Sequence, residues 1–237
     1  AVIFGWLNVI NFAHGALFMM GALMTWMAMN YLGINYWLML ILAPLVVGIF
    51  GVMVERLLLR WIYKLDHLYG LLLTLGLTLL IEGVFRSIYG VSGLGYDTPE
   101  LLEGATNLGF MIMPNYRAFV VLASLVVCVS TWYVIEKTKL GAYLRAGTEN
   151  PRLVEAFGIN VPVMVTLTYA FGAALAAFAG VLAAPVYQVT PLMGQNLIIV
   201  VFAVVVIGGM GSIMGSILTG LGLGVIEGFT KVFYPEA

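Results

Sequence analysis

Six apolar runs of about membrane-spanning length dominate this sequence. They lie at about 12–30, 37–54, 69–90, 117–135, 163–184 and 213–230. A helix needs about 20 residues to cross the hydrocarbon core of a bilayer, and it satisfies its own backbone hydrogen bonds there. Hydrophobic residues make up 62% of the chain and charged residues only 9%, so the connections must be short. The pattern predicts an all-α, polytopic bundle of transmembrane helices.

A seventh apolar run, Leu197 to Ile207, is too short to cross a membrane by itself, because an α-helix rises only about 1.5 Å per residue. Glycines at Gly208, Gly209 and Gly211 follow this run directly. We therefore expect an interrupted or re-entrant helix near 197–212.

Basic residues occur in two of the connections between these runs. They are Arg56, Arg60 and Lys64 in the first and Lys137, Lys139, Arg145 and Arg152 in the second. The connection between them, at 91–116, has acidic residues and no Lys or Arg. Because short cytoplasmic loops are enriched in Lys and Arg, we expect the two basic connections to be cytoplasmic and 91–116 to face outward.

Few charged residues fall inside the apolar runs. Glu82 and Arg86 are spaced i, i+4, so we expect them to form an ion pair, with a proton or cation relay as the alternative. Glu55 lies beside Arg56 at a membrane boundary, where a long side chain can reach water, and we assign it no transport role. Cys128, the single cysteine, is interpreted as a packing residue.

Small residues recur every four positions in two of the runs. They are Gly172, Ala176, Gly180 and Ala184 in one run and Gly220, Gly224 and Gly228 in the other. Small residues at this spacing let helix backbones approach closely in a membrane. We interpret both rows as packing seams.

The segment 136–162 holds seven of the chain's 21 acidic and basic residues. Asn150 followed by Pro151 is a typical helix start, and the following residues to Phe157 are predicted to form a short helix that stops at Gly158. Two short helices separated by a turn are suited to docking onto another protein. A solvated connector is the alternative.

Several classes of protein lack support in the sequence. The only Lys-Thr pair, Lys137-Thr138, follows Glu136 where a phosphate-binding loop needs glycine. His14 and His67 are far apart, and no catalytic triad or metal-ligand spacing is present. A net charge of −1 offers no basic surface for nucleic acid. The sequence thus predicts a protein that is not an enzyme and that binds no metal or nucleic acid.

Four motifs carry a family resemblance. They are NVINFAHGALFMMGA at 8–22, VERLLLR at 54–60, GAYLRAGTENPRLVEAFGIN at 141–160 and VIGGMGSIMGSILTGLGLGVIE at 206–227. Their order and spacing resemble those of the corresponding motifs in the inner-membrane permease subunits of branched-chain amino acid ABC transporters. The resemblance implies one permease domain over 1–237 in the inner membrane of a bacterial or archaeal cell. Such permeases have further helical segments before Ile3 and after Ala237, so we expect both ends to be truncated.

The resemblance also implies partners. A second permease subunit, two cytoplasmic ABC ATPases that use ATP, and an external solute-binding protein would work with this chain, which itself would bind no cofactor. The segment 136–162 would couple it to the ATPases. The residues assigned to coupling are Gly147, Glu149, Asn150, Pro151, Arg152, Glu155 and Gly158.

The translocation path is expected where polar and glycine residues interrupt apolar helices. The residues assigned to it are Asn11, His14, Gly15, Gly208, Gly209, Gly211 and Ser212. Asn8, Asn11 and His14 recur at i, i+3, i+6, so they form a polar stripe that either lines the path or holds a kink by hydrogen bonds between helices. The family resemblance favours branched-chain amino acids as solutes. Urea or short-chain amides are the alternative, and an ion-coupled secondary transporter is a second one.

Overall fold

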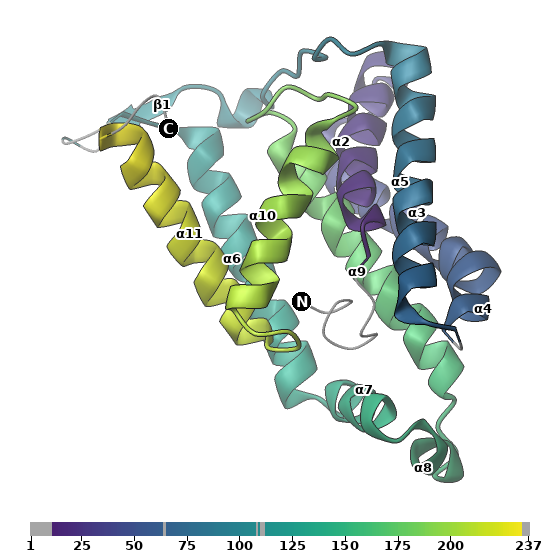
Figure 1. The fold of residues 1–237 in the computed structure, drawn as a ribbon. Coiled ribbons are helices and arrows are strands. Elements are labelled where there is room, and N and C mark those ends of the chain that lie inside the picture. Colours follow the sequence, from purple (N-terminus) through teal and green to yellow (C-terminus); the bar gives the residue numbers. More distant parts are fainter. Residues whose placement is uncertain (1–10, 64, 108, 110–111, 234–237) are drawn as a thin grey trace.

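The computed structural model describes residues 11–63, 65–107, 109 and 112–233 (Figure 1). The long helices are α2 Ala13–Leu32, α3 Tyr36–Val54, α5 His67–Tyr89, α6 Asn115–Lys137, α9 Val161–Ala183, α10 Met193–Ile207 and α11 Ile213–Phe233. The short elements are the π-helical turn η1 Glu55–Leu59, α4 Arg60–Ile62, the 3-10 turn η2 Glu100–Leu102, strands β1 Ala105–Asn107 and β2 Ile112–Pro114, α7 Lys139–Glu149 and α8 Pro151–Ala156. Asn8 lies outside the described residues.

The six predicted membrane-spanning helices are confirmed within the described part of the chain. They are α2, the continuous segment Tyr36–Ile62 formed by α3, η1 and α4, then α5, α6, α9 and α11. Helix α10 has 15 residues and ends at Ile207, and a turn separates it from α11. The predicted interruption near 197–212 is therefore also confirmed.

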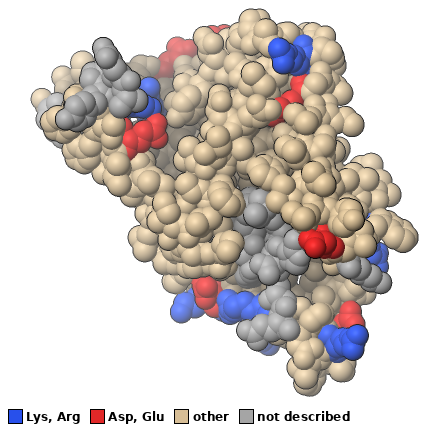
Figure 2. Space-filling model, in the orientation of Figure 1, with Lys and Arg blue, Asp and Glu red and all other residues tan. Residues whose placement is uncertain are grey.

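The helices divide into two groups with α10 between them. Helices α2, α3, α5 and α9 lie together on one side, whereas α6 and α11 lie on the other (Figure 1). Helix α9 packs most extensively against α3 and α2, and α10 touches both α2 and α11. Helices α7 and α8 project at the end where α9 begins, and Lys and Arg side chains gather there (Figure 2).

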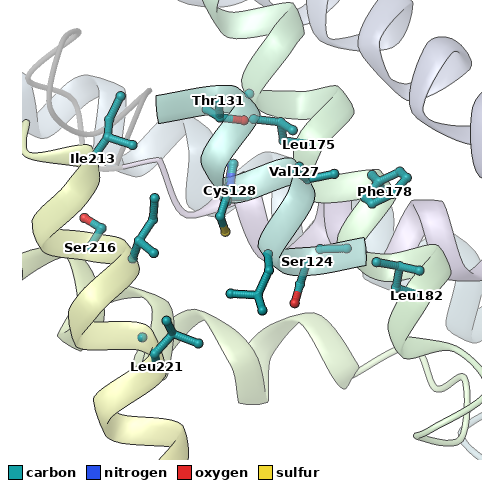
Figure 3. Close-up of a pocket in the computed structure, with 16 residues that line it drawn as sticks. Ser124, Val127, Cys128, Thr131, Leu175, Phe178, Leu182, Ile213, Ser216 and Leu221 are labelled. Atoms are coloured by element: carbon teal, nitrogen blue, oxygen red, sulfur yellow. The ribbon is translucent and has the colours of Figure 1, made fainter. Parts of the chain in front are cut away.

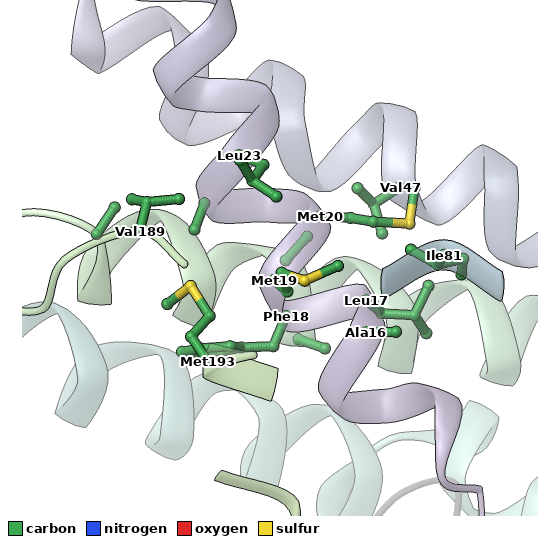
Figure 4. Packing of buried hydrophobic residues seen from close by; sticks show 14 of the residues in the cluster. Ala16, Leu17, Phe18, Met19, Met20, Leu23, Val47, Ile81, Val189 and Met193 are labelled. Carbon is green, nitrogen blue, oxygen red and sulfur yellow. The ribbon is translucent and has the colours of Figure 1, made fainter. Parts of the chain in front are cut away.

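The core lies where α2 crosses α9 (Figure 4). Gly21 of α2 lies against the Ala177 backbone, and Gly180 of α9 lies against the Phe18 backbone, so a Cβ at either glycine would overlap the facing chain. Fully buried side chains such as Met19 and Leu17 fill the space around this crossing. At Gly180 the seam predicted on α9 is thus a packing seam, because a small residue there lets two backbones meet, whereas Gly172 of the same row lines a cavity.

The second predicted seam, on α11, is different. Gly220 has only the Val204 side chain of α10 nearby, at 3.7 Å from the position of an added Cβ. Gly224 and Gly228 have no atom of the described residues within 4 Å of such a position. Within the described part of the chain, Gly220 thus meets α10, whereas Gly224 and Gly228 face open space, so the packing role of this row stays a prediction.

The connection 91–116, which is predicted to face outward, contains structure that the hydropathy pattern did not predict. Strands β1 and β2 form an antiparallel hairpin, with Thr106 paired to Met113. Leu94 in the same connection pairs with Val189, which lies between α9 and α10. These backbone contacts hold the connection against the end of the bundle opposite α7 and α8 (Figure 1).

Candidate functional site

A cavity of 440 Å³ lies between α2, α6, α9 and α11 (Figure 3). A second cavity of 170 Å³ lies between α2, α9 and α10. His14, Leu175 and Ala179 line both cavities. The two spaces therefore share one wall, formed by the start of α2 and the middle of α9.

His14 and Gly15, two of the residues assigned to the path, lie at this wall. His14 lines both cavities, and Gly15 lines the smaller one. Gly15 also faces Gly194 at the start of α10, and a Cβ at either glycine would overlap the other's carbonyl group. Gly15 thus allows α10 to approach α2 and sets the width of the smaller cavity.

Asn11 lies at the base of α2 but does not line either cavity. Its Nδ2 donates to the Tyr169 hydroxyl of α9 at 3.0 Å, and its Oδ1 accepts from the Ala13 backbone N–H at 3.0 Å. The side chain is 1% exposed. Asn11 therefore makes the hydrogen bond between helices that we considered as the alternative to a path-lining role.

The turn from α10 to α11 contains the other four residues assigned to the path. Gly209 and Gly211 have φ angles of 88° and 95°, a conformation that side-chain-bearing residues rarely adopt. The Ser212 Oγ accepts from the Gly215 backbone N–H at 3.0 Å, and Gly208 packs against Gly215. None of the four lines the two cavities, but the turn leads directly into Ile213, which lines the larger one.

The expectation that Glu55 reaches water is wrong. Its side chain is 1% exposed and lies at the start of the π-helical turn η1, facing α9. The Thr166 hydroxyl donates to its carboxylate at 2.6 Å. Burial, followed by the charge of Glu55, raises the pKa of the Tyr63 hydroxyl just beyond the membrane span. Glu55 is buried because α3 packs closely against α9, which keeps the carboxylate away from the boundary water.

The predicted ion pair of Glu82 with Arg86 is not formed. Glu82 is 5% exposed, whereas Arg86 is exposed one turn further along α5. The carboxylate of Glu82 accepts instead from the side-chain amide of Gln195 in the first turn of α10. A neutral side chain from another helix thus takes the place of the cation on the same helix as the partner of Glu82.

The segment assigned to coupling forms the predicted pair of short helices, α7 and α8. Asn150 caps α8 by accepting from the Leu153 N–H at 3.2 Å, and Pro151 is its first residue. Gly158 ends the segment with a φ of 80°. Gly147 lies in α7 and Glu149 is the last residue of that helix.

The solvent-facing surface of α8 combines charged and apolar side chains. Arg152 and Glu155, both assigned to coupling, are exposed. Leu153 and Phe157 are also exposed, at 55% and 77%, which the sequence analysis did not identify. Their i, i+4 spacing in a charged segment was the available signal. An exposed apolar pair bordered by charges is typical of a surface that binds another protein.

The sequence analysis also did not identify the wall of the larger cavity that α6 forms. Ser124, Cys128 and Thr131 of α6 line it, so Cys128 is not merely a packing residue. The spacing i, i+4, i+7 places the three on one face of α6, which could be seen in the sequence. Only the structure shows that this face lines a cavity that His14 also lines.

Six spanning helices, four of which line the larger cavity, with a charged helix pair projecting from one end, define a multi-pass membrane transport protein. The chain belongs to the family of branched-chain amino acid transport system permease components, whose model matches residues 1–236. It is thus a permease subunit of an ABC importer, and the family resemblance noted in the sequence is confirmed.

Several curated branched-chain amino acid permeases match nearly the whole chain. It is 28% identical over 248 residues to the high-affinity branched-chain amino acid transport system permease protein LivH of Salmonella typhimurium, a match covering 98% of this chain and 79% of that protein. It is 29% identical over 247 residues to BraD of Pseudomonas aeruginosa, covering 96% and 78%. A probable LivH of Methanocaldococcus jannaschii is 26% identical over 235 residues, covering 97% and 74%. No solved structure matches the chain significantly.

Proposed function

We propose that this permease subunit imports branched-chain amino acids together with a second permease subunit. Two cytoplasmic ATPases would drive transport by binding α7 and α8, and an external solute-binding protein would deliver the solute. The names of the relatives LivH and BraD support this solute class. The chain itself would bind no nucleotide or metal.

One observation carries the proposal. Helix α9 begins at Val161, five residues after α8 ends at Ala156, and its middle residues Leu175 and Ala179 line both cavities. A single rigid helix therefore joins the exposed pair α7–α8 to the walls of the cavities. Such a continuous, packed element can couple a cytoplasmic motor to a membrane path.

The solute is tested by uptake. The full-length protein, assembled with its partner subunits in vesicles, should take up radiolabelled leucine in the presence of ATP and the binding protein. Isoleucine and valine should compete, whereas urea and acetamide should not. Competition by urea with no uptake of leucine would contradict the proposed solute. Uptake that needs an ion gradient and no ATP would contradict the ATP-driven mechanism.

The coupling role is tested by reversing one charge on α8. Arg152→Glu changes the exposed surface of α8, and it should abolish ATP-dependent leucine uptake while the subunit stays in the membrane. Arg117→Glu is the matched control, because Arg117 is exposed at the opposite end of the bundle. Equal uptake by the two variants would contradict docking at α8.

A further inference from the structure

The larger cavity is lined mostly by apolar side chains, including Leu125 and Val127 of α6, and the same helix adds a row of polar ones (Figure 3). On α6, Ser124, Cys128 and Thr131 form a polar row on one helix face, and Ser216 of α11 lies across the space from them. On α9, apolar side chains such as Leu175 line the cavity. A mostly apolar space that carries one polar row suits a molecule with a small polar head and an apolar tail.

The polar side chains of this cavity offer hydrogen-bond acceptors. The Ser124 Oγ donates to the Val121 carbonyl at 2.8 Å, and the Ser216 Oγ donates to the Ser212 carbonyl at 3.0 Å. Each hydroxyl has one donor hydrogen and two acceptor lone pairs, so these two oxygens can still accept. A ligand group rich in N–H donors, such as a primary ammonium, is the natural complement.

The charge and size of the cavity narrow the class of ligand further. No Asp, Glu, Lys or Arg is present among the described residues that line it. A solute with a net charge would therefore be desolvated there without a counter-ion, whereas a zwitterion carries its own. The volume of 440 Å³ lies at the lower end of the range of about 300–1,000 Å³ found for small-molecule sites.

We propose that this cavity is the solute chamber of the permease and that the polar row on α6 binds the ammonium group of an aliphatic amino acid. The apolar wall on α9 contacts the side chain of the same solute. His14 lies where the chamber meets the smaller cavity, so the solute passes this residue on its way. The inference rests on the proposed function and adds a site on α6 to it.

The single cysteine of the chain provides a direct test, because Cys128 lies within the proposed site. The full-length transporter in vesicles is treated with a charged, water-soluble methanethiosulfonate, and the modified residue is identified by mass spectrometry. The reagent should modify Cys128 and reduce leucine uptake at least about tenfold, and excess leucine with binding protein and ATP should slow the modification. A Cys128→Ser variant, compared before and after the reagent, should show no loss.

Other outcomes would contradict the proposal that this cavity is the solute chamber. Modification of Cys128 by an apolar maleimide but not by the charged reagent would mean that lipid fills the cavity. Modification by the charged reagent without loss of uptake would place the cavity off the path. Failure of the untreated transporter to take up leucine would instead overturn the proposed function, so the two failures are distinguishable.

A second pair of variants tests the polar row without chemical modification. Ser124→Val removes a lining acceptor, and Ser130→Val is the matched control on the exposed side of α6. With saturating binding protein, Ser124→Val should lower the maximal rate of leucine uptake about tenfold, as expected for a lost hydrogen bond to a charged group. Ser130→Val should leave it unchanged. Equal rates in two variants with equal amounts of assembled transporter would contradict the proposed ammonium site.

Discussion

Helices α2 and α9 are packed very differently from α6 and α11, although all four are apolar and of similar length. In the most apolar window of each helix, 61% of residues in α2 and 56% in α9 are buried, against 11% in α6 and 6% in α11. Gly21 and Gly180 let α2 and α9 touch backbone to backbone. Helices α6 and α11 instead meet near Ile135 and Ile213, and the larger cavity lies between them further along (Figure 3).

The difference shows what decides packing in a membrane. Lipid chains are as apolar as leucine side chains, so hydrophobicity does not drive two helices together. Small residues and buried hydrogen bonds do, and the structure concentrates both on α9, where Tyr169 and Thr166 bind Asn11 and Glu55. Helices without such contacts leave room for a cavity between them, and their outer faces stay exposed.

The largest expected effect comes from adding a side chain at the α2–α9 crossing. Gly180→Leu would overlap the Phe18 backbone, so the two helices must separate, and we expect a loss of about 3 kcal/mol or more in the free energy of unfolding. Gly224→Leu on α11 is the control, because no atom of the described residues lies near it. Thermal melting of the purified full-length subunit should show a lower Tm for Gly180→Leu alone. Equal melting temperatures of the two variants would contradict the tighter packing of α2 against α9.

The next largest effect concerns the buried carboxylate of Glu55, which faces α9. Thr166→Val removes the hydroxyl that donates to Glu55 and leaves that carboxylate buried without this partner, which should cost about 1–3 kcal/mol of stability. Thr230→Val on α11 is the matched control, since its hydroxyl bonds only to the Ile226 carbonyl one turn earlier. Unfolding of both variants is compared in the same detergent. An equal loss from both would show that burial of Glu55 has no special importance.

The smallest expected effect concerns glycines on the α10–α11 side. Gly211→Ala places a Cβ on a residue with a φ of 95°, which should cost about 1–2 kcal/mol. Gly222→Ala has open space around it in the interior of α11 and should gain up to about 1 kcal/mol of helix stability. The opposite signs are measured as opposite shifts in Tm. Shifts of the same sign would mean that the turn does not require this backbone conformation.

Much of the fold could be predicted because a membrane limits the options. Length and hydropathy were enough to locate six spanning helices, and the glycines after Ile207 marked the end of α10. The caps Asn150 and Pro151 marked the start of α8. Each of these features is local, so neighbouring residues in the sequence carry the whole signal.

The partners of buried polar residues could not be predicted. Glu82 has Arg86 four residues away in the sequence, but its hydrogen bond comes from Gln195, on a different helix. Asn11 and His14 share a polar stripe, yet of these two residues only His14 lines a cavity. Asn11 is instead held by its hydrogen bond to the Tyr169 hydroxyl of α9. Helical periodicity tells which residues share a face but not which helix that face meets.

The short connection between α8 and α9 has a mechanical consequence. Four residues, 157–160, join the two helices, and a chain extends by at most about 3.5 Å per residue. A partner that displaces α8 further than this slack must pull on the end of α9. The same pull would also reach α6 through α7, because α7 is joined to α6 by Thr138 alone and packs against it. A pull on α8 would therefore act on both α9 and α6, the two helices that carry facing walls of the larger cavity.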